Sequence, residues 1–173
     1  DQKKFNIDVS DDAQSIYNKV CHIHYELALS NLPLLIDGKA QRITQNEQLA
    51  SYWERRKPSD GQINWHKSSK EIYDWIRGLT HPYPGAFTFY KNKKILIWKS
   101  ELTDVNITKD HPGTIIKISN KGIHVACIDK EIVLSKFQFE NNGILNVEET
   151  STLTMFELGT SFLNQRPGTL NEL

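Results

Sequence analysis

Residues 55–65 read RRKPSDGQINW, residues 66–79 read HKSSKEIYDWIRGL, and residues 80–87 read THPYPGAF. The first stretch is a basic connector rich in turn-forming residues, so we expect a boundary between two parts of the chain there. The second stretch has the apolar spacing of a helix, and the third ends that helix with proline and glycine. From Ala86 onward the pattern is that of short strands. This region therefore separates a helical part of the chain from a β part.

A capping box marks the start of the predicted helix within residues 66–79. The Ser68 hydroxyl can accept a hydrogen bond from the Glu71 amide, and the Glu71 carboxylate can accept one from the Ser68 amide. The apolar residues that follow share one helical face, and they are Ile72, Trp75, Ile76 and Leu79. Pro82 has no amide hydrogen, so the helix is expected to end before it.

The N-terminal part predicts a longer amphipathic helix. It opens at Ser10-Asp11-Asp12, where side-chain oxygens can cap free amides, and it stops at the turn pair Asp37-Gly38. Its apolar stripe is made by Ile16, Val20, Ile23 and Leu27. Such a stripe needs a surface to pack on, and the pattern offers no parallel sheet for it, so we expect that surface to come from sequence upstream of residue 1. Residues 39–50 are polar and predict a loop, and residues 49–53 predict a short strand or an extended segment.

The C-terminal part predicts antiparallel β-structure. Residues 86–90 and 95–99 flank a four-residue loop, and residues 114–119 and 123–128 flank a second turn. Residues 132–139 predict one further strand. Short strands with regularly spaced turns are typical of a small barrel or sandwich. The sequence as a whole therefore predicts an α+β fold.

Composition narrows the class of protein. The chain has 173 residues, of which 38% are hydrophobic, but no apolar run approaches the roughly 18 residues of a membrane span. The N-terminus lacks the features of a signal peptide, and two cysteines are too few for a disulfide-stapled domain. We therefore expect a cytoplasmic protein. The only methionine is Met155, so we also expect the chain to be a piece of a longer protein.

The charges of the chain balance, but they are unevenly distributed. Residues 101–173 hold six Lys or Arg against ten Asp or Glu, a net charge of −4, which leaves +4 for residues 1–100. A polyanionic nucleic acid would be repelled by the C-terminal half. The basic excess lies between Lys39 and Arg77, where a small phosphate group could bind.

Two groups of residues are candidate sites. Cys21, His22 and His24 do not predict a metal site, because two histidines two positions apart on a helix face different directions. The cluster of cations and aromatic rings at Arg55, Arg56, Trp65 and Tyr83 is the better candidate, because arginine binds phosphate oxygens in a two-pronged geometry and aromatic faces stack on bases. The alternative is that Trp65 and Phe87 belong to the core and that the arginines lie in a solvated turn.

The same residues resemble the formyltransferase family that uses N10-formyltetrahydrofolate. The family's C-terminal segment typically reads basic-Pro-Glu-Asp-Gly, then Ile-Asp-Trp, then a helix with an Ile-Arg pair, then Pro-Trp-Pro-Gly-Ala-Phe. This chain has the same order and spacing in residues 56–61, Ile63-Asn64-Trp65, Ile76-Arg77 and residues 82–87. Pro112-Gly113-Thr114 is similar to the family's next element. The departures are Ser59, Asn64 and Tyr83, where the family usually has Glu, Asp and Trp.

The resemblance implies two domains. Residues 1–51 would be the tail of a Rossmann-like catalytic domain, and residues 52–173 would be a small OB-like β-barrel domain. It also implies N10-formyltetrahydrofolate as co-substrate and no metal. The catalytic Asn, His and Asp of the family, and most of its folate site, would lie upstream of Asp1, so no catalytic residue and no folate contact is assigned in this chain, which alone would be inactive.

Two acceptors and one structural role remain open. The resemblance and the negative charge of residues 101–173 favour the amine of a nucleotide-linked amino sugar. Arg55 and Arg56 would lie near its diphosphate, with Trp65 or Tyr83 nearby shaping the pocket. The alternative acceptor is methionyl-tRNA, whose binding calls for a basic face. The third reading is a structural or oligomerising module, for instance in a homodimer.

Overall fold

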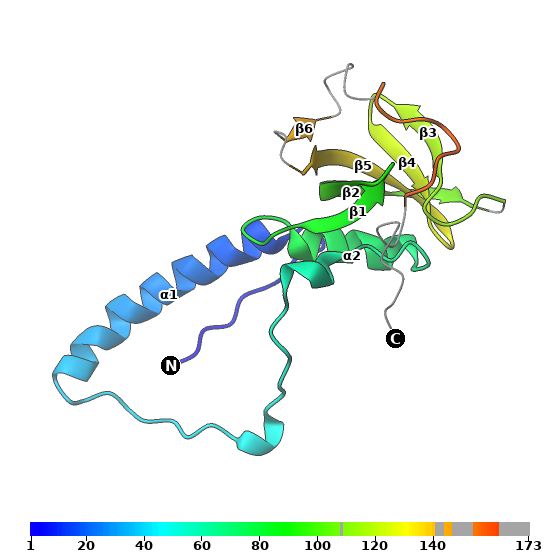
Figure 1. Ribbon diagram of the computed structural model, residues 1–173. Helices are drawn as coiled ribbons and strands as arrows, with labels where there is room; N and C mark the ends of the chain where they lie inside the picture. The colour runs from blue at the N-terminus through cyan, green and yellow to red at the C-terminus, as the bar shows by residue number, and fades with distance from the viewer. Residues whose placement is uncertain (108, 141–143, 147–153, 163–173) are drawn as a thin grey trace. The chain divides into compact units, whose positions relative to one another are not determined.

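The computed structural model describes residues 1–107, 109–140, 144–146 and 154–162 (Figure 1). The chain forms two compact units, Asp1–Arg56 and Lys57–Leu173, and each is described by itself. The first unit is helical and extended, whereas the second contains every strand that the described residues form.

Unit 1 is built around α1 (Ala13–Ile36). The Asp12 carboxylate accepts a hydrogen bond from the Ser15 amide at 2.9 Å, and the Ser15 hydroxyl accepts one from the Asp12 amide at 3.0 Å, so the helix begins where the sequence predicts. It ends at Ile36, Asp37 is its C-cap residue, and Gly38 follows with a φ of +70°. Glycine adopts this left-handed conformation without steric cost, which explains the predicted stop.

The rest of unit 1 is extended chain interrupted by the short 3₁₀ turn η1 (Glu47–Leu49) (Figure 1). Of the two forms predicted for residues 49–53, the strand is absent, because Leu49 closes this turn and residues 50–53 form no strand. A strand needs a neighbour that accepts and donates its backbone hydrogen bonds, and the described part of unit 1 contains no other strand.

Unit 2 begins with η2 (Pro58–Gly61) and α2 (Ser69–Leu79). The predicted capping box is confirmed, with the Glu71 amide donating to the Ser68 hydroxyl at 3.2 Å and the Ser68 amide donating to the Glu71 carboxylate at 3.0 Å. The strands are β1 (Ala86–Tyr90), β2 (Lys93–Asn106), β3 (Ile115–Ser119), β4 (Gly122–Ala126), β5 (Lys130–Phe139) and β6 (Leu145–Asn146).

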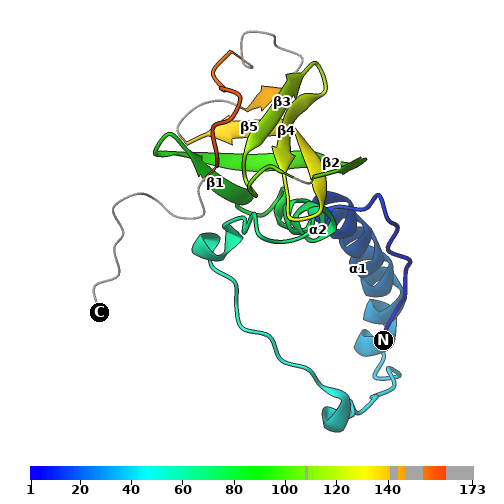
Figure 2. The same ribbon diagram turned by 90° about the vertical axis from the view of Figure 1, so that its right-hand side faces the viewer.

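The strands form one antiparallel sheet in the order β1-β2-β5-β4-β3 (Figure 2), and β6 pairs with β5 (Figure 1). Two details differ from the prediction. The turn between β1 and β2 has two residues, Lys91 and Asn92, both with positive φ, where a four-residue loop was expected. Strand β2 continues to Asn106 instead of ending at Lys99, because β5 pairs with it from Ile95 to Asn106.

The α+β class is confirmed, but the described strands do not close a barrel, since no pairing joins β1 to β3. Helix α2 packs its buried face, Ile72 and Ile76, against the sheet. Residues 154–162 return to the same core with Phe156 and Phe162, whose rings join Tyr90 and Phe137. The core of unit 2 thus lies between one helix, one sheet face and this returning segment.

Candidate functional site

The connector that precedes α2 is fixed to the first strand of the sheet. The Ile63 amide donates to the Phe87 carbonyl at 2.8 Å, and Gln62 forms a parallel bridge with Phe87. Gly61 passes so close to the chain that a Cβ there would lie 2.7 Å from the Gly85 carbonyl oxygen. The glycine of the Asp-Gly pair is therefore required for this backbone contact.

The predicted site residue Trp65 lies in the core of unit 2. Its side chain is 1% exposed, its Nε1 donates to the Thr88 hydroxyl at 3.0 Å, and its ring stacks on Phe162 at 5.5 Å. A Cβ on Gly113 would lie 3.2 Å from the indole, so the chain passes directly over the ring. A ligand has no access to this ring in the fold described, and the core alternative holds for Trp65 and also for Phe87, which is 6% exposed.

The predicted site residue Tyr83 lies at the surface, in the loop between α2 and β1, and is 50% exposed. The Thr80 hydroxyl donates to the Trp98 carbonyl at 3.1 Å and the Gly85 amide donates to the Leu79 carbonyl at 3.0 Å, so both ends of the loop are fixed. His81 stacks on Trp98 at 4.1 Å. The loop is therefore held against Trp98, and the Tyr83 ring and one face of the His81 ring lie at its surface.

The two predicted arginines, Arg55 and Arg56, are exposed and are the last residues of unit 1. Tyr83 and Trp65 belong to unit 2. The four residues thus do not form a site within either unit, and Tyr83 is the one aromatic member with an accessible ring.

A groove that sequence reasoning missed lies beside α2 and has a volume of about 570 Å³. Its lining residues come from the connector and from one side of the helix: Gln62, Ile63, Asn64, Lys67, Glu71, Ile72, Asp74 and Trp75. Asn64 is one of the three departures from the family pattern, which is the signal that could have drawn attention to this place. The groove offers an indole and two amides, the usual components of a site for a planar polar molecule.

The carboxylates at the rim of this groove are held ionised by their partners. The Ser68 hydroxyl and amide, followed by Lys67, lower the pKa of Glu71 to about 2. Burial opposes ionisation of Asp74, but hydrogen bonds from Lys70 and Arg77 outweigh it and lower the pKa of that carboxyl. Both acids therefore serve as ion-pair partners at neutral pH and neither is suited to donate a proton there.

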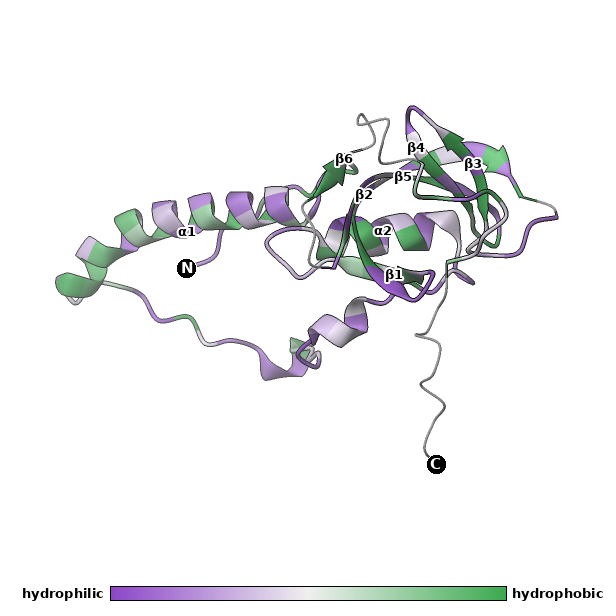
Figure 3. Cartoon of the chain, turned by 45° about the horizontal axis from the view of Figure 1, so that its top comes forward, coloured by the Kyte–Doolittle hydropathy of each residue, from purple (hydrophilic) through white to green (hydrophobic). Residues whose placement is uncertain are grey.

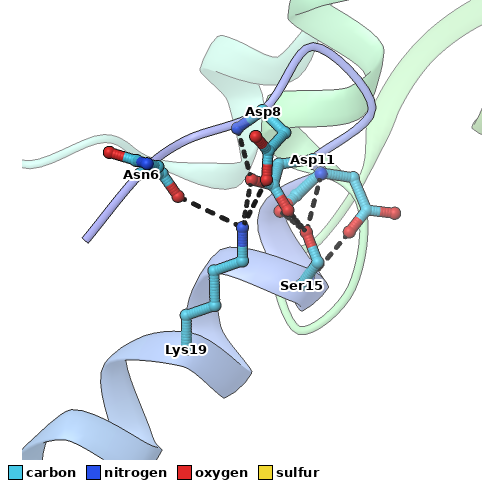
Figure 4. A network of polar contacts seen from close by, with 6 residues as sticks. Asn6, Asp8, Asp11, Ser15 and Lys19 are labelled. Atoms are coloured by element: carbon cyan, nitrogen blue, oxygen red, sulfur yellow. Dashed lines mark hydrogen bonds and ion pairs between the residues drawn. The ribbon is translucent and has the colours of Figure 1, made fainter.

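A second polar cluster fixes the segment before α1 in unit 1 (Figure 4). Asp11 accepts hydrogen bonds from Lys19 at 2.6 Å, from the Asp8 amide at 2.7 Å and from the Ser15 hydroxyl at 2.8 Å. These contacts, led by the Lys19 hydrogen bond, lower the pKa of Asp11 to about 2. Lys19 also donates to Asp8 and to the Asn6 carbonyl, so one ammonium group orders residues 6–11.

The thiols and histidines form no recognisable metal centre. Cys21 is exposed, whereas Cys127 is buried and its burial raises the pKa of the thiol to about 12. Within the described ranges, no three His, Cys, Asp or Glu side chains are grouped as a metal ion would need. Neither helix in the described part of the chain has the length and apolar character for crossing a bilayer.

Comparison with known proteins gives one family and several relatives. The model of a family described as "Formyl transferase, C-terminal domain" matches residues 55–152. The bifunctional polymyxin resistance protein ArnA of Wigglesworthia glossinidia brevipalpis is 33% identical over 145 residues, which cover 84% of this chain and 22% of that protein. The methionyl-tRNA formyltransferase of Acetivibrio thermocellus is 34% identical over 148 residues, which cover 84% of this chain and 47% of that protein. The chain thus spans less than half the length of either relative.

Among solved structures, a variant of HypX from Aquifex aeolicus shares the fold with a TM-score of 0.63 at 14% identity, covering 84% of this chain and 26% of HypX. HypX in complex with tetrahydrofolic acid has a TM-score of 0.56 at 14% identity, covering 72% of this chain and 22% of that chain. At this identity the likeness establishes the fold alone.

Proposed function

The chain belongs to the formyl transferase C-terminal domain family, and on this basis we propose that it is the C-terminal part of a cytoplasmic enzyme that transfers a formyl group from N10-formyltetrahydrofolate to an amine. The observation that carries the proposal is the family match over residues 55–152, which coincides with the connector, α2 and the antiparallel sheet. The solved HypX complex with tetrahydrofolic acid supports folate as the donor. The two free cysteines are typical of a reducing compartment.

The proposal assigns residues 1–51 to the end of the catalytic domain and residues 52–173 to the C-terminal domain. Helix α1 supports this assignment, because apolar side chains on it lie exposed, most of them toward its C-terminal end (Figure 3). These exposed residues are Tyr17, Tyr25, Leu29, Leu32, Leu34, Leu35 and Ile36. Seven exposed apolar side chains on one helix are typical of a surface that packs on another domain. We further assign the sheet to an OB-like barrel, since β2 pairs with β5 through three register shifts, which bend a strand.

The acceptor in this proposal is the amine of a nucleotide-linked amino sugar. Its support is electrostatic: residues 101–173, which include most of the sheet, carry a net charge of −4. A domain that holds tRNA gains much of its affinity from phosphates neutralised over a wide basic face. Here the net charge of residues 52–173 is +2, and its basic excess is confined to residues 52–100. A nucleoside diphosphate has only two phosphates, so two arginines such as Arg55 and Arg56 are sufficient to hold it.

Methionyl-tRNA is the second candidate acceptor, favoured by the 34% identity to a methionyl-tRNA formyltransferase. The two acceptors are distinguished by giving the full-length enzyme N10-formyltetrahydrofolate with either substrate at several salt concentrations. We expect formylation of the nucleotide-linked amino sugar with a shallow salt dependence. Formylation of the tRNA alone, falling steeply with salt, would show that the acceptor assignment is wrong.

The arginines are tested in the same full-length enzyme. Replacing Arg55 and Arg56 together by Ala removes charge-assisted hydrogen bonds to phosphate, so we expect KM for the acceptor to rise at least about tenfold. Arg42→Ala is the matched control, since Arg42 is also exposed in the extended part of unit 1. Equal KM values for the double variant and for Arg42→Ala would remove the arginines from the acceptor site.

The third reading, a structural or homodimer-forming module, is tested with the chain itself. A dimer in size-exclusion chromatography, together with a melting temperature unaffected by nucleotide, would favour that reading over acceptor binding. A melting temperature that rises with nucleotide would favour the acceptor role, because ligand bound to the native state stabilises it.

A further inference from the structure

Three polar side chains lie on neighbouring strands, on the face of the sheet that points away from the core: Ser119, His124 and Glu131. In β4, Ile123 and Val125 belong to the core cluster, so His124 between them points to the opposite face. In β5 the core residues are Ile132 and Leu134, which places Glu131 on that same opposite face. Both side chains are nevertheless buried, since His124 is 5% and Glu131 6% exposed.

The strand register brings the three side chains together. His124 is paired with Lys117 of β3 and with Val133 of β5. Ser119 lies two residues after Lys117 and Glu131 two residues before Val133, so both are diagonal neighbours of His124. Diagonal neighbours are about 7–8 Å apart at Cα, a span that an imidazole with a hydroxyl or a carboxylate can bridge. One histidine therefore connects a serine on one side with a glutamate on the other.

The hydrogen bonds define a direction for the proton. The Ser119 Oγ lies 2.9 Å from His124 Nε2, and His124 Nδ1 lies 3.0 Å from Glu131 Oε1. The Lys121 amide donates to the Ser119 Oγ at 3.2 Å. A carboxylate accepts hydrogen bonds and does not donate them, so the ring proton belongs on Nδ1 and Nε2 accepts from the Ser119 hydroxyl.

The backbone holds this arrangement in place. Gly122 has a φ of +147°, and a Cβ there would lie 2.3 Å from the Leu134 carbonyl oxygen, so β4 passes very close to β5 beside the histidine. Ser119 and Gly122 are paired across a tight turn whose other residues, Asn120 and Lys121, are exposed. The serine is thus half-buried at the end of a hairpin, while the histidine and glutamate behind it are buried.

We propose that Ser119 is an activated nucleophile, with His124 as its general base and Glu131 holding the imidazole in the required tautomer. A nucleophile and a base within hydrogen-bond reach, with the base oriented by a third group, is the arrangement by which such sites are recognised on unrelated folds. Ser119 lies half-buried at the end of a hairpin, and we expect its substrate to be an activated ester. This activity is independent of formyl transfer.

The reaction proceeds in two balanced steps. The Ser119 Oγ bonds to the acyl carbon while its proton passes to His124 Nε2, and the ester C–O bond breaks as the alcohol leaves with that proton. Water then gives a proton to the same nitrogen and attacks the acyl carbon, which releases the carboxylic acid and returns the proton to Ser119. The net reaction is ester hydrolysis, and the serine ester is the intermediate that can be trapped.

The test uses a fluorophosphonate probe on the 173-residue chain, with peptide mass spectrometry as readout. The expected adduct forms on Ser119, with fluoride and the serine proton lost as HF. Ser119→Ala should abolish it, and His124→Asn and Glu131→Gln should slow it by about 10²-fold or more, the usual contribution of a positioned base. Ser135→Ala, on the same strand as Glu131, is the matched control and should label at the original rate.

A second measurement covers the case in which His124→Asn fails to fold. Ser119→Cys places a thiol beside the imidazole, where its alkylation by iodoacetamide should exceed that of the exposed Cys21 at least about tenfold in the same molecule. Equal alkylation of the two thiols, or fluorophosphonate spread evenly over several serines, would overturn the proposal. The three residues would then be a structural clamp, and their variants would lower the melting temperature without changing reactivity.

Discussion

The hydrogen bond between Trp65 and Thr88 is the sharpest test of the core assignment. The indole is 1% exposed and Thr88 is fully buried, and the two side chains meet at 3.0 Å inside unit 2. Trp65→Phe removes the donor and part of the ring, and Thr88→Val removes the acceptor while keeping the shape of the side chain. Both variants and their combination form a double-mutant cycle.

The magnitudes follow from burial and hydrogen bonding. Trp65→Phe loses roughly 40 Å² of buried apolar surface, about 1 kcal/mol at about 25 cal/mol per Å². The lost hydrogen bond adds about 1 kcal/mol, for a total of about 2 kcal/mol. Thr88→Val costs about 1 kcal/mol for the same bond. Because the bond can be lost only once, the combined variant should be destabilised by about 2 kcal/mol, with a coupling of about 1 kcal/mol.

The assay is urea unfolding followed by far-ultraviolet circular dichroism, which does not depend on the tryptophan that is replaced. Equal denaturant slopes in all four proteins would justify the comparison. Strict additivity, or a Trp65→Phe variant within about 0.5 kcal/mol of the original, would refute the core assignment. A Trp65→Phe full-length enzyme with original stability and a raised acceptor KM would instead return Trp65 to the binding site.

The remaining predictions concern one carboxylate and two glycines. The pKa of Asp11 is lowered to about 2 from an ordinary 3.8, so its contribution to stability is fully present above about pH 4 and is lost as the pH falls through about 2. Amide exchange in the first turn of α1 should show this loss in the original chain and in Asp37→Asn, but not in Asp11→Asn. Gly122→Ala should cost more than about 2 kcal/mol in thermal melts, because its Cβ would lie 2.3 Å from the Leu134 carbonyl oxygen at a φ of +147°. Gly78→Ala in α2 meets nothing within 4 Å and should instead stabilise by about 0.5–1 kcal/mol, so equal effects of the two changes would contradict the reasoning.

The helices were predictable because their signals are local. Asp12 and Ser15 cap α1, Ser68 and Glu71 cap α2, and each cap lies within four residues of the groups that it satisfies. The apolar spacing of α2 also identified the two residues that it buries in the core, Ile72 and Ile76.

The full length of β2 was not predictable in the same way. Charged residues after Lys99, namely Glu101 and Asp104, have the composition of a loop, and only the distant β5 turns this segment into a strand. Beyond Ile97 the other edge of β2 has no partner strand among the described strands, and such an edge tolerates charged side chains. The strand order also depends on these distant pairings, since β5 lies between β2 and β4.

The predicted site shows a second limit of sequence reasoning, because residues that lie close together in sequence have different environments in the structure. Trp65 and Tyr83 lie among the same cations and prolines along the chain, but the first belongs to the core and the second is half exposed. Sequence distinguishes them poorly, since an indole serves equally well as core and as stacking surface. The group of Ser119, His124 and Glu131 could not be predicted from sequence. These residues are up to twelve positions apart, and only the strand register brings them together.

The residues by which the family is recognised therefore contribute mostly to the fold of unit 2. Gly61 lies against the Gly85 carbonyl, Gly85 leaves room for Trp98 at a φ of +90°, and Trp65 is sealed beneath Gly113. A ligand must be held by side chains that this framework leaves exposed, and Tyr83 is the aromatic residue of the motif that meets this condition. Tyr83→Phe keeps the ring and Tyr83→Ala removes it, so an acceptor contact by stacking should raise KM in the full-length enzyme only in the second variant. If Tyr83→Ala also leaves KM for the acceptor unchanged, Tyr83 makes no contact with the acceptor, and the arginines alone remain as candidates.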